Sequence, residues 1–356
     1  MQTTSSGVLF MNVLSLFDGI GCGLLALKRC GYTIDSYYAS EIEPNAIRVA
    51  QKNHPEIIEL GDICHVRYKN GVLYTPANAY SVGHIDLICG GSPCTNFSSI
   101  GYANGMVAGD VEVVSPEQYM ELKKQNVSFS GQSYLFWEYC RLLEEVQPTY
   151  FLLENVVMAK KWEDIITRAL GVAPIRINSS LLSAQNRPRL YWTNIDGIEI
   201  PKDQHLVLDD ILCENADSRD VSYCLTVQRN FPRMIEKYGY IPERFNAYNA
   251  TELREKACAL SRGSMITSSC ATLLFVRNED GVHEVKDGVL NGQYKTKLPN
   301  GRYNLRKLNL TEIERLQNLP DGYTGGLGIS EQKRTEMIGN GWTVDVIRHI
   351  FSYMGE

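Results

Sequence analysis

The feature that most constrains the fold is an alternation of short apolar runs with longer segments of helical spacing through the first 200 residues. The runs that predict buried strands are 8–17, 36–40, 57–60, 85–89 and 150–153. The segments that predict helices are 23–30, 44–52, 134–146 and 162–170. Strands that alternate with helices indicate βαβ units and a parallel sheet covered on both faces. We therefore predict an α/β fold with a doubly wound, mostly parallel, Rossmann-like sheet.

A second, smaller domain is predicted after residue 197, where Gly, Asn, Tyr and basic residues replace the regular pattern. Helical spacing returns at 309–319 and 342–353. The predicted domains are 1–197 plus 320–356, and 198–319. The formal net charge is −6, yet residues 221–310 hold 14 Lys and Arg against 8 Asp and Glu. This basic region is compatible with a polyanionic partner at one face, although a mild excess is also ordinary for a protein surface.

Cysteine usage and hydropathy bear on the compartment. The ten cysteines include no C-x-x-C pair, and the spacing of Cys89 and Cys94 matches no common zinc site. We expect reduced thiols, no metal and a cytoplasmic protein. The apolar run 8–17 is shorter than the roughly 18 residues of a transmembrane helix. Residues 1–7 carry no positive charge and do not predict a secretory signal.

A glycine-rich loop, residues 17–23, separates the first predicted strand from the first predicted helix. Its glycines allow a sharp turn and close approach of the backbone to a ligand. Glu41 ends the second strand about 20 residues on, where an acidic residue typically binds ribose hydroxyls, and Asp62 follows the third strand. The set favours an adenosine-containing cofactor without separating NAD from S-adenosylmethionine. A tight turn with no ligand is the alternative.

Three further motifs lie at predicted strand ends. Residues 90–94, Gly-Gly-Ser-Pro-Cys, place the Cys94 thiol at the carboxyl edge of the sheet, where cationic groups or amides lower a thiol pKa. Glu154 closes the fifth strand, and Arg187 and Arg189 offer two guanidinium groups two residues apart. The alternatives are an inert buried cysteine, a helix-capping or ion-paired glutamate, and surface ion pairs.

In this order, the motifs Phe-Asp-Gly-x-Gly, Pro-Cys, Glu-Asn-Val, Gln-x-Arg-x-Arg and Gly-Asn resemble those of the cytosine-C5 DNA methyltransferases. The resemblance runs from Val13 to Phe351. Residues 13–28, 39–41 and 342–351 are similar to the catalytic domain of the animal de novo enzymes. The short N-terminus favours a stand-alone prokaryotic or phage enzyme, acting in restriction–modification or in phage DNA self-protection.

The resemblance implies a reaction. Cys94 adds as thiolate to C6 of a cytosine flipped out of a short specific DNA sequence, so that C5 can accept a methyl group from S-adenosylmethionine. Glu154 binds the exocyclic amine and N3 of the base. Arg189 holds O2, and Arg187 supports the active-site loop and the base.

The resemblance also implies a cofactor site and a DNA interface. The cofactor residues are Phe17, Asp18, Gly19, Gly21, Gly23, Glu41, Ile42, Asp62, Ile63, Pro93, Leu135, Asn340, Gly341 and Trp342. The family usually has Gly-Asn-Ala-Val where this chain has Gly-Asn-Gly-Trp at 339–342, which leaves the contacts at that end open. Candidate DNA contacts are Ser98, Arg229, Arg233, Arg262, Lys295, Lys297 and Arg302.

The expected partner is double-stranded DNA, with a cognate restriction endonuclease as a further possibility and a monomer as the default state. The stretch from Cys94 to Leu135 is either a glycine-containing lid or an insertion, and for 111–128 we favour a solvent-exposed insertion.

Three alternatives remain. A related tRNA methyltransferase typically carries Pro-Pro-Cys and a Cys-Phe-Thr tripeptide, whereas Ser92 precedes Pro93 here and no such tripeptide occurs. A second alternative is a catalytically idle DNA-binding homologue. The intact Cys94, Glu154, Arg187 and Arg189 argue against it. A nicotinamide oxidoreductase leaves Pro-Cys and Glu-Asn-Val unexplained.

Overall fold

The structure is a computed structural model that describes residues 2–3, 9–93, 107–108, 111–214, 220, 225–260 and 272–355. The chain forms two compact units. The first comprises Met1–Asn178, Pro188–Pro201 and Val344–Glu356, and the second comprises Ser179–Arg187 and Lys202–Thr343. The predicted domains, 1–197 plus 320–356 and 198–319, concern cofactor and DNA binding, and that assignment stays a prediction.

A mixed, mostly parallel sheet forms the centre of the first unit, in agreement with the predicted fold class. Its strand order is β13-β15-β12-β8-β2-β3-β4, and β1 (Gln2–Thr3) pairs with β2. Strands β12 (Tyr150–Val156), β8 (Leu87–Gly90), β2 (Leu9–Leu16), β3 (Thr33–Ser40) and β4 (Ile58–Glu59) run parallel. β15 (Pro188–Thr193) and β13 (Ile175–Asn178) add an antiparallel edge, which the sequence did not predict.

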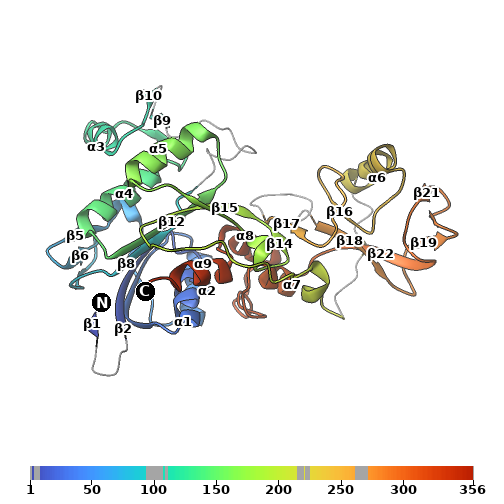
Figure 1. Cartoon of the computed structure of the whole chain (residues 1–356), viewed down its shortest axis with the longest axis horizontal. Helices are drawn as coiled ribbons and strands as arrows, with labels where there is room; N and C mark the ends of the chain where they lie inside the picture. The colour runs from blue at the N-terminus through green and yellow to red at the C-terminus, as the bar shows by residue number, and fades with distance from the viewer. Residues whose placement is uncertain are drawn as a thin grey trace. The chain divides into compact units, whose positions relative to one another are not determined.

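Helices cover both faces of this sheet (Figure 1). Leu14, Leu16 and Tyr38 pack in one hydrophobic cluster with α4 (Leu135–Val146) and α5 (Lys160–Leu170). The other face is covered by α1 (Cys22–Cys30), α2 (Pro44–Asn53) and α9 (Val344–Phe351). α1 and α9 are joined by an ion pair of 3.0 Å between Arg29 and Asp345.

The prediction that residues 111–128 form a solvent-exposed insertion is wrong in part. The segment is not exposed throughout, because Val113 and Tyr119 are buried. It contains α3 (Pro116–Lys124), and β10 (Val111–Glu112) lies in a small antiparallel sheet with β9 (Val107–Ala108) and β11 (Phe129–Ser130). A second small sheet joins β5 (Arg67–Lys69), β6 (Val72–Tyr74) and β7 (Ala79–Ser81).

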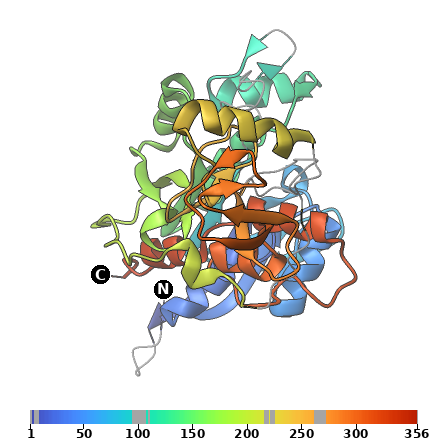
Figure 2. The ribbon, with the colours of Figure 1, turned by 90° about the vertical axis from the view of Figure 1, so that its right-hand side faces the viewer.

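The second unit is built on an antiparallel sheet of six short strands. Their order is β16 (Arg244–Asn246), β18 (Thr272–Arg277), β22 (Gly301–Lys307), β19 (His283–Lys286), β20 (Val289–Leu290) and β21 (Tyr294–Lys295). Figure 2 shows α6 (Leu225–Tyr238) beside this sheet, and Phe231 and Met234 pack there in a hydrophobic cluster with Phe245 and Phe275. Strands of two to seven residues leave little periodicity, so the sequence did not predict them.

Shorter elements complete the second unit. A parallel pair joins β14 (Gln185–Asn186) to β17 (Ala257–Cys258), and α7 (Leu310–Leu316) and α8 (Glu331–Asn340) follow the six-stranded sheet. The described residues include three 3-10 helices: η1 (Ile63–His65) in the first unit, and η2 (Ser179–Leu181) and η3 (Leu208–Ile211) in the second. In the part of the chain that the structure describes, no helix is long and apolar enough to cross a membrane.

Candidate active site at the carboxyl edge of the large sheet

The residues predicted to carry chemistry gather where the parallel strands of the first unit end. Asp18 follows β2, Glu41 follows β3, Asp62 follows β4, Pro93 follows β8, and Glu154 lies near the end of β12. The carboxyl ends of parallel strands share one edge of a sheet, and ligands of open α/β sheets bind outside that edge. Cys94, with Ser98, lies outside the described residues.

The loop after β2 has the backbone conformation that its glycines imply. Gly19 and Gly21 have φ of 64° and 81°, a left-handed region open to glycine at little cost. Phe17 has φ 58°, which is uncommon for a residue with a side chain. Gly21 is the N-cap of α1, with Gly23 in its first turn. The loop is therefore shaped for close approach of another group, and strained residues of this kind cluster at ligand sites.

Gly90 explains why two strands meet so closely at this edge. A Cβ built on Gly90 lies 2.6 Å from the carbonyl oxygen of Leu16 on the adjacent strand. Any side chain there would push β8 away from β2, and the Pro93 loop with it.

Two carboxylates fix this loop to the end of β3. Glu41 accepts hydrogen bonds from the backbone amides of Gly19 (2.9 Å), Ile42 (2.7 Å) and Glu43 (2.9 Å). Asp18 Oδ1 accepts from the hydroxyls of Ser15 (2.6 Å) and Tyr37 (2.7 Å). Asp18 Oδ2 is buried and has no partner in the structure, and burial raises the pKa of the Asp18 carboxyl.

A third acid, Glu59, was missed from the sequence. It ends β4, and both its carboxyl oxygens are buried without a hydrogen-bond partner in the structure. Burial, followed by the charges of Asp18 and Glu41, raises the pKa of Glu59 to about 8. The only available signal was an acid inside the apolar run Ile57-Ile58-Glu59-Leu60.

The remaining predicted cofactor residues of the first unit flank this edge. Asp62 caps η1 by accepting from the Cys64 amide at 2.9 Å, and 43% of its side chain remains exposed. Ile63 is buried, whereas Ile42 is 63% exposed. Phe17 and Leu135 are partly buried against the cluster that joins the sheet to α4.

Glu154 and Arg189 form an ion pair. The Arg189 Nε lies 2.9 Å from the Glu154 carboxylate, and the two side chains are 14% and 12% exposed. The pairing of β12 with β15 brings them together, because Val156 is opposite Arg189 and Glu154 opposite Tyr191. The Glu154–Arg189 ion pair therefore lies near the end of β12 with little access to water.

Asn155 connects Glu154 to the segment that leads to Cys94. Its side-chain amide donates to the Ser92 carbonyl (3.2 Å) and hydroxyl (3.1 Å), and both residues are buried. The start of the Pro93-Cys94 loop is therefore anchored one residue from Glu154. The sequence contained Asn155 in its motif but gave no indication of this role.

Arg187 and residues 340–342 belong to the second unit, unlike the other predicted site residues described so far. The Arg187 guanidinium is buried and donates to the carbonyls of Leu260 (3.0 Å), Gly339 (3.0 Å) and Gly341 (3.1 Å). It thus fixes the backbone beside Asn340, which is exposed, and Trp342, which is half-buried.

Comparison with known proteins gives the family. Residues 11–167, which include most of β2 together with Glu41, Asp62 and Glu154, match the C-5 cytosine-specific DNA methylase family. Over these residues the chain is similar to the C-5 cytosine-specific DNA methylases. This confirms the family resemblance seen in the sequence. The family uses S-adenosylmethionine generally.

Three phage relatives are similar to part of this chain. They are the orphan methyltransferases M.Rho11sI of Bacillus phage rho11s (28% identical), M.SPRI of phage SPR (27%) and M.SPBetaI of phage SPbeta (28%). The matches cover 55%, 52% and 55% of this chain, and 35%, 38% and 47% of the relatives. The chain thus spans less than half the length of these relatives.

Solved structures share the methylase fold over nearly the whole chain. The Entamoeba histolytica methyltransferase EhMeth matches with a TM-score of 0.61 at 13% identity, and S. pombe Dnmt2 with 0.58 at 16%. Each match covers 97% of this chain and 98% of the other. A putative DNA modification methyltransferase encoded within an E. coli prophage matches with 0.51 at 18%, over 97% and 98% of the two chains. At these identities the likeness concerns the fold alone.

The predicted DNA contacts that the structure describes are dispersed over the second unit. Arg229 and Arg233 lie on α6, Lys295 on β21 and Arg302 on β22, and all four are exposed. Lys297 lies over the Tyr240 ring, 3.9 Å from its centre. Arg262 lies outside the described residues.

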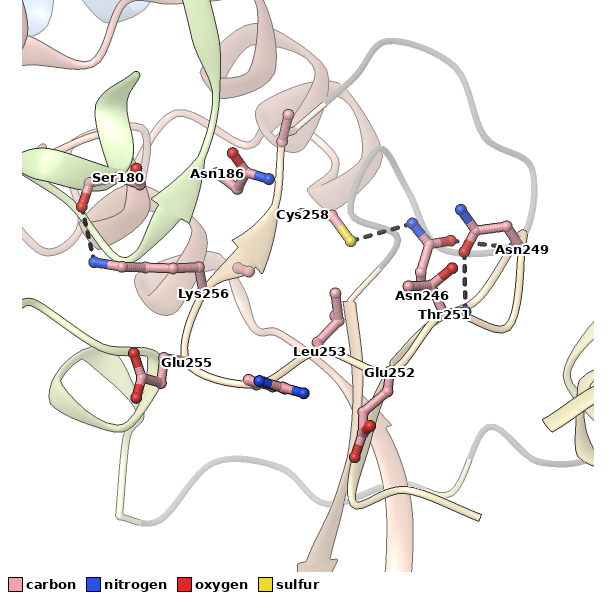
Figure 3. Close-up of a pocket in the computed structure, with 13 residues that line it drawn as sticks. Ser180, Asn186, Asn246, Asn249, Thr251, Glu252, Leu253, Glu255, Lys256 and Cys258 are labelled. Carbon is pink, nitrogen blue, oxygen red and sulfur yellow. Dashed lines mark hydrogen bonds between the residues drawn. The ribbon is translucent and has the colours of Figure 1, made fainter. Parts of the chain in front are cut away.

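A hollow of about 670 Å³ also opens within the second unit (Figure 3). Asn186, Asn246 and Asn249 line it together with residues 251–259. One wall is fixed by Lys256, whose Nζ donates to the carbonyls of Ser180 (2.8 Å), Ser183 (3.3 Å) and Leu206. The sequence did not predict this hollow.

Proposed function

We propose that this chain is a DNA (cytosine-5)-methyltransferase that modifies a short specific sequence in duplex DNA. The observation that carries the proposal is the family match over residues 11–167, which include Glu154 and Asn155. Arg189 pairs with Glu154 from outside that range, and Asn155 donates to Ser92 in the segment that leads to Cys94. The proposal goes beyond the family in naming the duplex substrate, the covalent step and the role of each residue.

Cys94 is the proposed nucleophile, and its thiolate forms a bond to C6 of a flipped-out cytosine. Glu154 hydrogen-bonds the exocyclic amine and N3 and so stabilises the charge that develops on the ring. Arg189 holds Glu154 in place and contacts O2. Arg187, whose guanidinium is already bonded to three carbonyls, acts as a positioning residue.

The cofactor site of the first unit fits S-adenosylmethionine. When bound, this cofactor supplies an electrophilic methyl group and carries a positively charged sulfonium. Glu41 is held by three backbone amides in the orientation to accept from ribose hydroxyls, and the unpartnered buried oxygens of Asp18 and Glu59 are suited to a cationic ligand. Phe17, Asp62, Ile63, Pro93 and Leu135 are the further proposed residues of that site. The family resemblance adds Asn340, Gly341 and Trp342 of the second unit as proposed cofactor residues.

Bisulfite sequencing of a plasmid from cells that express the chain tests the proposal. We expect 5-methylcytosine at one short motif, and none with the Cys94→Ala control. Soluble protein that binds S-adenosylmethionine but leaves DNA unmethylated would contradict the proposed substrate and favour RNA substrates or an idle homologue.

Cys94→Ser should abolish methyl transfer while DNA and cofactor binding persist, because a hydroxyl is a far weaker nucleophile at neutral pH than a thiolate. Full turnover by Cys94→Ser would exclude Cys94 from the mechanism. Single-turnover methyl transfer with parallel binding assays gives both readouts.

The phage relatives favour a role in protection of phage DNA, since their names describe them as orphan methyltransferases. On this proposal the chain acts in the cytoplasm as a monomer, without an obligatory restriction endonuclease. Methylation in a host that lacks any cognate endonuclease gene would support that role.

A further inference from the structure

The hollow of the second unit is built beside Arg187. Asn186, the residue before it, is opposite Cys258 in the pairing of β14 with β17. Cys258 Sγ accepts a hydrogen bond of 3.2 Å from the side-chain amide of Asn246, so these three residues follow one another along one wall (Figure 3). Arg187 donates to the carbonyl of Leu260, the residue after the lining segment 251–259. The wall of the hollow and the proposed positioning residue Arg187 are therefore joined through the same two chain segments.

The size and the lining of the hollow suit a nucleobase. Its volume, about 670 Å³, lies within the range of about 300–1,000 Å³ typical of small-molecule sites. Leu253, Ala257 and Ala259 give it apolar surface, whereas the side-chain amides of Asn186 and Asn249 offer donors and acceptors. A flat ring with donors and acceptors around its edge complements such a lining, and nucleobases have this form.

The charges of the hollow distinguish a base from the phosphate backbone. Its two cationic side chains, Arg254 and Lys256, are balanced by Glu252 and Glu255. The Lys256 ammonium is already bonded to three backbone carbonyls. A hollow without net positive charge does not attract the anionic backbone of a duplex. A paired base is enclosed in the stack, so the base that fits this hollow is one that has left the stack.

Exposed cations lie at the rim of the hollow instead. Lys237 Nζ is 3.4 Å from the hydroxyl of Thr251, a lining residue. Lys297 Nζ lies 3.9 Å from the centre of the Tyr240 ring, and the Tyr240 hydroxyl donates to the carboxylate of Glu252 at 3.0 Å. Both lysines are exposed, and lysines are common phosphate contacts. A neutral hollow beside exposed cations fits one nucleotide, with its base inside and its phosphate at the rim.

Two donors in the lining are free to bind such a base. The turn that carries Asn249 is fixed by its own hydrogen bonds, because Asn246 Oδ1 accepts from the Tyr248 amide (2.8 Å) and Asn249 Oδ1 accepts from the Thr251 amide (3.0 Å). Within the described part of the chain, neither the side-chain nitrogen of Asn249 nor the guanidinium of Arg254 has a hydrogen-bond partner. Arginine and asparagine are the usual side-chain donors to base edges.

We propose that the hollow binds a second extruded base of the DNA, besides the target cytosine, and that Asn249 and Arg254 hydrogen-bond its edge. The inference rests on the proposed function, because it assumes a duplex DNA substrate. Asn186 is three residues before Arg189 in the chain, so we expect the second base within or beside the recognition sequence. Asn249 and Arg254 are then specificity-determining residues. One good contact between a side chain and a base discriminates against the wrong base by about 5- to 150-fold.

The fluorescence of 2-aminopurine tests the proposal, because this base brightens when it or its neighbour leaves the stack. Duplexes carry the motif found by bisulfite sequencing and one 2-aminopurine at each position in turn, and saturating protein is added with S-adenosylhomocysteine. We expect wild type to brighten probes beside the target cytosine and at one further position. Asn249→Ala and Arg254→Ala should lose the further rise and keep the rise beside the target.

Two matched substitutions outside the hollow are the controls, and both should keep the two rises. Asn300→Ala removes an exposed asparagine that accepts one backbone amide, as Asn249 does. Arg176→Ala removes an exposed arginine on β13. If wild type brightens only the probes beside the target, or if both hollow variants retain the further rise, the inference fails and the proposed function stands. If wild type binds RNA but no duplex DNA, the inference and the proposed substrate both fail.

A second test needs no variant. The cost of extruding a base is least where that base is mismatched, so a mismatch at the further position should raise the affinity of wild type for the duplex by about tenfold or more. Unchanged affinity for mismatches at every position except the target pair would contradict a second extruded base.

Discussion

At the scale of single residues, Asn155 has the most specific contacts of the candidate site. Asn155→Ala removes two hydrogen bonds to Ser92 and leaves buried polar groups unsatisfied, at a cost of about 1–3 kcal/mol. We expect lower stability in urea unfolding and a larger loss of methyl transfer than of cofactor binding, because the loop to Cys94 loses its anchor. Ser92→Ala removes one acceptor only and should cost less. Additive effects of the two substitutions would contradict a shared contact.

Substitution of Glu154 tests its proposed role and its pairing with Arg189. Glu154→Gln keeps the shape but removes the charge that Arg189 neutralises, and we expect methyl transfer to fall about 10²–10⁴-fold, the range typical of a lost acid–base group. Cofactor affinity, measured by calorimetry, should change less than twofold. Arg189→Lys, which keeps the charge, should retain more activity than Arg189→Ala. Equal activity of the two Arg189 variants would exclude a role for the charge.

Glu59 makes stability depend on pH. Its folded pKa, about 8, lies above its ordinary value of 4.5, so the folded protein holds a proton that the unfolded chain has lost. Its contribution to stability is therefore complete below pH 4.5 and is lost as the pH rises toward and through 8. We expect urea unfolding of the cofactor-free protein to show this decline between pH 5.5 and 8.5, and Glu59→Gln to flatten it. Parallel curves for the two proteins would contradict the assignment.

At the scale of elements, a buried ionic network attaches α3 to α4. Glu138 on α4 is fully buried. Its carboxylate accepts hydrogen bonds from Tyr119 and Lys123 of α3 and from Arg141 of its own helix. Removal of one partner from a buried ion pair costs about 3–5 kcal/mol. Glu138→Gln should therefore release α3, measured as faster proteolysis near residues 123–126, whereas the exposed Glu121→Gln should not. Unchanged proteolysis of Glu138→Gln would show that apolar packing alone holds α3.

The prediction of elements from the sequence succeeded where a strand or helix has enough residues to show its period. β2, β3, β12, α4 and α5 coincide with predicted segments because each buries a continuous or periodic apolar face. The short strands of the second unit lack that length. They are stabilised by pairing with residues distant in sequence, which a local pattern does not report.

At the scale of the whole molecule, the proposed cofactor residues belong to both compact units. We predict that S-adenosylmethionine slows amide hydrogen exchange at residues 17–23, 41–43 and 59–63 of the first unit and at 339–343 of the second. At a ligand concentration of about 100 times Kd, binding stabilises the folded state by about 2.7 kcal/mol. Mass spectrometry of peptides gives the readout. Protection restricted to the first unit would remove Asn340–Trp342 from the site.

Glu41→Ala tests the ribose contact proposed for Glu41. It removes the acceptor of three backbone amides as well as the proposed ribose contact, so it should raise the cofactor KM more than it changes DNA affinity. Glu41→Gln keeps an acceptor and should fall between wild type and Glu41→Ala. A larger effect on DNA affinity would overturn the ribose assignment.

The sequence by itself determined the family, the α/β fold class and the strand ends at which the motif residues lie, because apolar period and motif order are local properties. Only the tertiary structure decided the partners of those residues. Arg189 meets Glu154 through an antiparallel strand, Asn155 reaches Ser92 across the sheet, and Arg187 bonds to carbonyls of Leu260, Gly339 and Gly341. Glu59 carries no motif at all, and its raised pKa arises from burial and from two acids on other strand ends. Such properties depend on which distant residues the fold brings together, and a local pattern does not contain them.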